Sequence, residues 1–188
     1  MLRMLILIAV VMFVGLSVQV YAQDSSTRTN ALVASLDKTK YKKKEKKNIS
    51  IEFYLNIKNE AVVRAPADYA GSYDAGNNGS SLSLQVDSRG SASGSGSDTF
   101  DRDRRMSFTL KDASISGALL TGTKVYENGE QRPFEGVFVN RTVSTGKNAN
   151  TIESQETNFG IGFIVNSSSS DESGKIETWT NRIFLMRR

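Results

Sequence analysis

The sequence predicts an all-β protein, and three observations lead to this prediction. Apolar and polar residues alternate with a period of two in several segments, most clearly at residues 49–58. Turn sequences such as Asp87-Ser-Arg-Gly90 and Asn128-Gly129 separate these segments. The chain has only two prolines and no stretch with sustained helical periodicity. We therefore expect a single antiparallel β-barrel of about eight or nine strands, with a β-sandwich as the alternative.

The N-terminal segment, residues 1–22, has the layout of a cleaved signal peptide. Arg3 precedes an unbroken apolar run at residues 4–16, and Val20 and Ala22 place small residues before the cut. The run is shorter than the roughly 20 residues that span a bilayer, although a retained N-terminal anchor is the alternative. We expect an exported bacterial protein, periplasmic or extracellular. Since the chain has no cysteine, its stability must come from burial and hydrogen bonds.

A polar, lysine-rich arm is predicted at residues 23–47. Between residues 38 and 47 the chain has seven lysines and one acidic residue, whereas the rest of the mature chain is slightly acidic. The run is formed chiefly by Lys42, Lys43, Lys44, Lys46 and Lys47. We interpret it as a solvated arm whose like charges keep the neighbouring strand edge from pairing. Weak, salt-dependent contact with an anionic envelope surface is the alternative. Nucleic acid is not expected as a partner, because the predicted export separates the protein from nucleic acid.

The remaining chain, residues 48–188, is predicted to form the barrel domain. Strands are expected at residues 49–58, 82–86, 91–97, 106–110, 115–126, 134–142, 159–165 and 176–186, with a serine-rich loop at residues 166–174. The segment 91–97 could also be a linker, but the tight turn before it favours a strand. Such a strand places Ala92, Gly94 and Gly96 on one face, which leaves room for large rings or a cavity.

Composition excludes most catalytic chemistry. The chain has neither histidine nor cysteine, which removes imidazole acid–base catalysis, thiol nucleophiles, Ser-His-Asp triads and ordinary zinc sites. Asp98, Asp101 and Asp103 could offer oxygens to calcium, but arginines lie among them and the calcium-loop spacing is missing. We interpret residues 98–105 as a solvated hairpin loop. No cofactor, no metal and no enzymatic activity are expected, and a hydrolase that uses carboxylates alone is the least favoured function.

A family resemblance rests on two short stretches. Asp68-Tyr-Ala-Gly-Ser-Tyr73, followed by hairpins and a last strand with Asn181-Arg182-Ile183, resembles a lipocalin-type (calycin) barrel. Residues 134–142 are also similar to exported bacterial proteins of lipocalin-like appearance. The resemblance implies that Gly71 and Tyr73 take the place of a Gly-x-Trp motif on the first strand. It also implies that Arg182 packs across the ring of Tyr73 and so closes the barrel. Such a resemblance implies a fold more than a function.

Two non-catalytic functions remain open. An exported envelope protein of this fold could bind a small apolar or amphipathic ligand inside the barrel. The residues expected to line that site are Leu84, Phe108, Leu110 and Phe138. Alternatively, the barrel has a filled core and is a structural or protein-interaction module of the cell envelope, with its working surface on the loops and the basic arm.

Overall fold

The computed structural model describes residues 25–38, 40–44, 52–76, 79–100, 104–148, 150–170 and 176–188. These residues form one helix at residues 25–37, a short 3-10 helix η1 (Pro66–Tyr69) and ten β-strands. The strands are β1 (Lys40–Lys44), β2 (Glu52–Ala61), β3 (Gly71–Asp74), β4 (Ser81–Val86), β5 (Ser91–Phe100), β6 (Arg104–Ser116), β7 (Leu119–Tyr126), β8 (Gln131–Gly146), β9 (Ser154–Ser170) and β10 (Ile176–Arg187). The predicted signal peptide, residues 1–22, lies outside the described residues.

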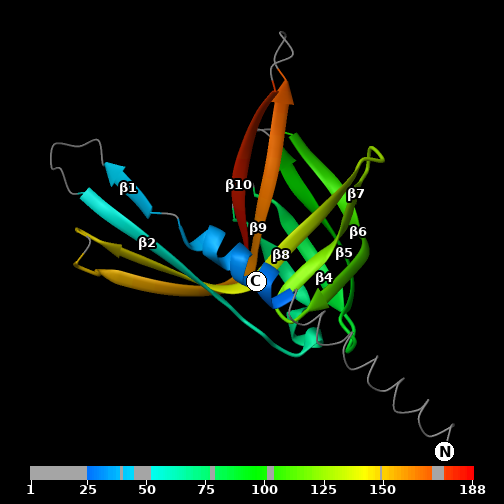
Figure 1. Cartoon of the computed structure of the whole chain (residues 1–188), viewed down its shortest axis with the longest axis horizontal. Coiled ribbons are helices and arrows are strands. Elements are labelled where there is room, and N and C mark those ends of the chain that lie inside the picture. Colours follow the sequence, from blue (N-terminus) through cyan, green and yellow to red (C-terminus); the bar gives the residue numbers. More distant parts are fainter. Residues whose placement is uncertain are drawn as a thin grey trace, which may run out of the picture.

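Eight of the ten strands close into an antiparallel barrel (Figure 1). They follow one another in the order β8-β7-β6-β5-β4-β3-β10-β9, and β9 then pairs with β8. Every neighbouring pair is antiparallel, as tight turns between consecutive strands require. The predicted all-β barrel is confirmed, and the β-sandwich alternative is wrong because the sheet closes on itself.

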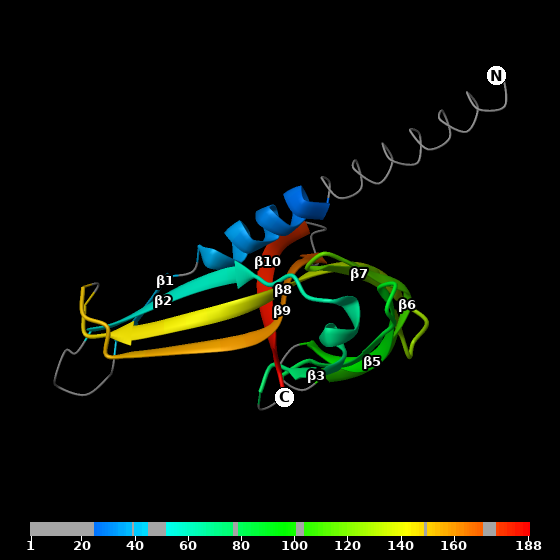
Figure 2. The same ribbon diagram turned by 90° about the horizontal axis from the view of Figure 1, so that it is seen from below.

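Strands β8 and β9 are long enough to take part in two structures. Residues 131–137 of β8 pair with β7 in the barrel, whereas residues 139–146 pair with β2 outside it. In the same way, β9 pairs with β10 at residues 160–170 and with β8 at residues 154–163. The outer halves of both strands, together with β1 and β2, form a sheet that extends away from the barrel (Figure 2). We call β1, β2 and residues 139–159 the wing.

The helix at residues 25–37 lies across the outer side of β8, β9 and β10 (Figure 2). Its apolar residues Leu32, Val33 and Leu36 pack against the core cluster. Gly162 makes this approach possible, because a Cβ there would lie 2.3 Å from Leu36 Cδ1. Asp37 Oδ1 accepts a hydrogen bond of 3.1 Å from the Asn59 amide. The first part of the predicted polar arm is thus a docked helix. Among the described residues, no helix is both long and apolar enough to cross a membrane.

The lysine run does not remain an unstructured arm. Residues 40–44 form β1, which pairs with β2 at the outer edge of the sheet. Lys42, Lys43 and Lys44 lie in this strand, whereas Lys46 and Lys47 lie outside the described residues. Of the strand predicted at residues 49–58, the described part is confirmed from Glu52 onwards.

Glycines at three turns have the positive φ that tight turns require. Gly90 (φ 87°) and Gly129 (φ 83°) end the two turns that the sequence predicts. Gly117 (φ 62°) forms a third turn, between β6 and β7, inside the segment 115–126 that was expected to be one strand. That expectation is wrong, because apolar residues continue through the turn and hide it. The loop expected at residues 166–174 is also shorter, since β9 extends to Ser170.

Candidate ligand-binding site at the β7–β8 end of the barrel

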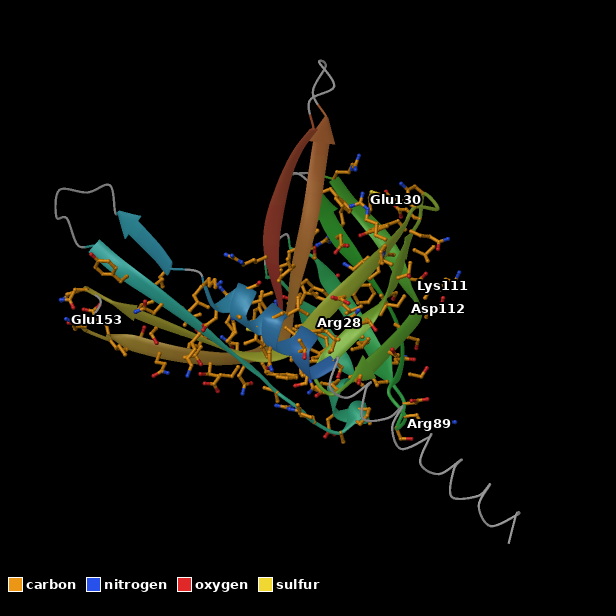
Figure 3. The ribbon with its side chains drawn as sticks, in the orientation of Figure 1. Arg28, Arg89, Lys111, Asp112, Glu130 and Glu153 are labelled. Atoms are coloured by element: carbon orange, nitrogen blue, oxygen red, sulfur yellow. The ribbon has the colours of Figure 1, made fainter. Side chains whose placement is uncertain are left out.

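The two ends of the barrel differ in what fills them. At one end, η1 lies beside the β6–β7 turn, and the hydroxyl of Tyr69 reaches the carbonyl of Gly117 at 3.0 Å. We call this the η1 end. The β7–β8 turn lies at the other end of β7, where Figure 3 shows Glu130. This β7–β8 end contains the only described ion pair in which both side chains are nearly enclosed.

That ion pair joins β5 to β7. Lys124 Nζ lies 2.7 Å from Asp98 Oδ2, and both side chains are 13% exposed. The hydroxyl of Tyr126 donates a hydrogen bond of 2.6 Å to the same carboxylate oxygen. Successive side chains of a strand alternate between the two faces, so Leu120, Lys124 and Tyr126 of β7 share the inner face. Two charges are thus held in the wall of an otherwise apolar barrel.

Three phenylalanine rings surround the ammonium group of Lys124. Its Nζ lies 4.4 Å from the ring centre of Phe108, 5.4 Å from that of Phe163 and 5.9 Å from that of Phe134. Aromatic faces attract cations, and more strongly where water is excluded. The rings and the carboxylate together compensate the ammonium for the water that it loses.

The ionisation of this cluster reflects its burial. Burial lowers the pKa of Lys124, and the nearby carboxylate of Asp98 opposes that shift. Burial also raises the pKa of Tyr126, and its hydrogen bond to Asp98 raises it further. At neutral pH the tyrosine is therefore a neutral donor, and the cluster has one carboxylate that two donors share.

A second group of aromatic and charged residues lies at the rim of the same end. The guanidinium of Arg132 lies 5.0 Å from the ring centre of Phe100 and that of Arg104 lies 5.6 Å from it. Arg132 Nε also lies 2.6 Å from a carboxylate oxygen of Glu130. The rim therefore offers one aromatic ring with two guanidinium groups close to it.

The η1 end is closed by a different arrangement. Tyr69 is fully buried and its ring stacks on Phe138 at 4.1 Å between ring centres. The hydroxyl of Tyr69 accepts from the Arg64 amide at 2.7 Å and lies 2.9 Å from the Val62 carbonyl. Tyr73 is 1% exposed and donates to the Tyr69 carbonyl at 2.5 Å. Rings and backbone bonds leave this end filled.

The arginine that lies beside Tyr73 is Arg187, not Arg182. Arg187 is the cross-strand partner of Tyr73, and its guanidinium donates to the carbonyls of Asp68 (3.0 Å) and Ala70 (2.9 Å) around η1. Arg182 pairs with Ile164, nearer the start of β10. The sequence resemblance thus placed the partner of Tyr73 at another arginine of the same strand.

The four residues expected to line a ligand site do not meet at one place. Leu84, Phe108 and Phe138 are buried, and Leu110 is partly buried against the core. Phe138 stacks on Tyr69 at the η1 end, whereas Phe108 contacts Lys124 at the β7–β8 end. The small residues of β5 were expected to leave room for large rings or a cavity. At Gly96 the room is taken by a ring, because a Cβ there would lie 2.8 Å from the ring of Phe108.

Sequence reasoning missed the pair of Asp98 and Lys124. Residues 98–105 were interpreted as a solvated loop, but β5 continues to Phe100 and β6 begins at Arg104. Asp98 therefore lies in a strand, and Asp101 and Asp103 lie outside the described residues. No group of three described acidic residues is placed to hold a metal ion. The signal that could have found the pair is the position of Lys124. It follows buried Leu120 by four residues and therefore lies on the same face of β7.

A separate small cavity lies outside the barrel, between the helix and the wing. Its volume is about 50 Å³. It is lined by Leu36, Ile57, Asn59, Arg141, Arg182, Ile183 and Phe184. A cavity of this size has room for water or a small ion rather than an organic ligand.

Comparison with known proteins adds no relative. No protein-family model, no curated protein and no solved structure matches this chain. The function must therefore be argued from the geometry alone.

Proposed function

We propose that this chain is a non-catalytic exported protein of lipocalin-like type that binds a small amphipathic ligand at the β7–β8 end of its barrel. One observation carries the proposal: an ion pair and a tyrosine hydroxyl are enclosed by phenylalanine rings inside the barrel. Apolar walls with a few convergent polar groups are the usual composition of ligand sites.

The chemistry of the site defines the class of ligand. The apolar part of a ligand packs against Phe108, Phe134 and Phe163. Its polar group takes the place of one partner in the pair of Asp98 and Lys124. Two further guanidinium groups lie at the rim, at Arg104 and Arg132. An anionic head group, a carboxylate or a sulfonate, therefore fits better than a cationic one.

The first test asks which molecule accompanies the protein. Native mass spectrometry of the protein purified from its own host should show an added mass that organic solvent releases. The second test uses an anionic fluorescent probe, anilinonaphthalene sulfonate. We expect Lys124→Met to weaken probe binding about tenfold or more, since a charge-assisted contact is lost. The matched control is Lys111→Met, a lysine on the outer side of β6 (Figure 3). Equal probe binding by both variants, each shown to be folded, would refute the proposal.

A filled barrel used as a scaffold is the second candidate. The rings at the η1 end favour it, because Tyr69, Phe138 and Tyr73 leave that half of the interior packed. On this alternative the barrel holds an interaction surface and binds no small molecule. Protein without a released mass, together with an undisturbed probe signal in Lys124→Met, would favour the scaffold.

A further inference from the structure

We propose that the wing docks on an anionic lipid bilayer, with the lysine-rich strand β1 near the phosphate groups and Ile152 inserted among the head groups. The wing extends away from the barrel, so a flat surface can reach it without meeting the barrel (Figures 1 and 2). This inference is independent of any ligand inside the barrel.

The charge of the wing comes from its outermost strand. Four of the five residues of β1 are lysines, and β1 is the last strand of the sheet order. These four charges equal the formal net charge of the whole chain, +4. Two other lysines of the wing have acidic partners, Lys58 with Glu60 (2.9 Å) and Lys147 with Glu153 (3.3 Å). The charge excess is therefore concentrated along one edge.

The far end of the wing presents a large apolar residue to solvent. Ile152 is 64% exposed, and among the described residues the other large apolar side chain with such exposure is Val63, at 73%. Ile152 immediately precedes Glu153, which Figure 3 shows at the tip of the wing. Two hydrogen bonds join residues just before Ile152: Asn148 Oδ1 accepts from the backbone N–H of Asn150 (3.0 Å) and from the Thr151 hydroxyl (2.9 Å).

An anionic bilayer fits these features better than other occupants. Pairing of β1 with β1 of a second copy would bring lysine rows together, which is unfavourable. Lysine, a compact point charge, is suited to head-group phosphates and adds attraction near an anionic leaflet. An exposed aliphatic side chain on the same wing adds burial in the interface, and the two contributions together give reversible binding.

The experiment measures co-sedimentation of the protein, as its host exports it, with lipid vesicles. One set of vesicles is pure phosphatidylcholine, and the other is an equimolar mixture with phosphatidylglycerol. We expect binding to the mixed vesicles, weakened by salt, and much less binding to phosphatidylcholine. An N-terminal apolar segment, if mass spectrometry shows that it is retained, would bind both kinds of vesicle equally. Equal binding to both by protein that mass spectrometry shows to lack this segment overturns the proposal.

Two matched pairs of variants locate the contact. Lys42→Ser with Lys43→Ser should weaken binding about 30-fold, at roughly fivefold for each lysine. The control removes two basic residues of the barrel, Arg89→Ser with Lys111→Ser, and should change binding little.

The second pair tests the apolar contact. Ile152→Asn should weaken binding about fivefold, whereas Val63→Asn should not. Both residues are exposed, so neither change should affect folding. If Ile152→Asn is without effect and soluble polyphosphate binds as tightly as the vesicles, the wing is a general polyanion site and the proposal is wrong.

Discussion

Breaking the pair of Asp98 and Lys124 should lower the free energy of unfolding by more than the loss of a single ordinary hydrogen bond. At 2.7 Å and an effective dielectric constant of about 20, the direct attraction between the charges is about 6 kcal/mol. Desolvation of both groups offsets much of it. Lys124→Met leaves the carboxylate with the Tyr126 hydroxyl alone and should cost about 3–5 kcal/mol, as removal of one partner of a buried pair does.

A double-mutant cycle separates the interaction from the loss of packing. We expect Asp98→Asn and Lys124→Met each to lower the free energy of unfolding, and their combination to cost about 3 kcal/mol less than the sum. Urea unfolding followed by far-ultraviolet circular dichroism measures each value, and unchanged m-values show that the reference states are comparable.

A second ion pair of the same chain is the control. Glu130 and Arg132 are joined at 2.6 Å, but their side chains are 41% and 43% exposed. Because water screens this pair, its coupling should be much smaller than that of the enclosed pair. Additive effects of Asp98→Asn and Lys124→Met, or equal couplings in the two cycles, would refute the argument that enclosure makes the inner pair important.

Three further predictions concern the η1 end and the helix. Tyr69→Phe should lower the free energy of unfolding by about 2–3 kcal/mol in urea titrations, because its hydroxyl accepts from the Arg64 amide and its one hydrogen is shared between the carbonyls of Val62 and Gly117; an effect below about 0.5 kcal/mol would contradict this role. Burial raises the pKa of Tyr73 to about 12, so the unfolded chain ionises first: the contribution of Tyr73 to stability should be intact below pH 10 and fall by about 1.4 kcal/mol per pH unit from there to about pH 12, a part of the slope that Tyr73→Phe should remove. Gly162→Ala should cost about 1–3 kcal/mol in wild type but little in a Leu36→Ala background, since its Cβ would meet Leu36; equal costs in thermal unfolding would place the strain elsewhere.

The barrel strands could be predicted because one face of each is buried and the other is not. Leu82 and Leu84 alternate with exposed Ser83 and Gln85, and this pattern is readable without any structure. The helix at residues 25–37 also left a signal, because Leu32 and Leu36 are four residues apart. Its polar composition hid that signal, since one narrow stripe is enough for a helix that lies against an already formed sheet.

The site could be predicted only in part, because its residues meet through the closure of the barrel. Asp98 and Lys124 belong to strands that are not neighbours in the sheet, since β6 lies between them. Nothing in a linear pattern pairs them. The assignment of Arg182 as the partner of Tyr73 failed for a similar reason: the partner depends on the register of β10 against β3, which only two residue pairs define. Sequence alternation fixes the face of a residue and leaves its height along the barrel open.

The different bonding at the two ends of the barrel explains why a ligand would enter at one of them. At the η1 end, side chains are hydrogen-bonded to backbone carbonyls and amides, as Tyr69 is to Arg64 and Gly117. Opening this end of the barrel would therefore break hydrogen bonds to the backbone. At the β7–β8 end, the enclosed groups are bonded to one another through Asp98. A ligand that supplies an equivalent polar group can replace such a partner without disturbing a strand pairing. Exchange of side-chain partners costs less than disruption of the backbone ladder, so the proposed binding at this end would leave the barrel intact.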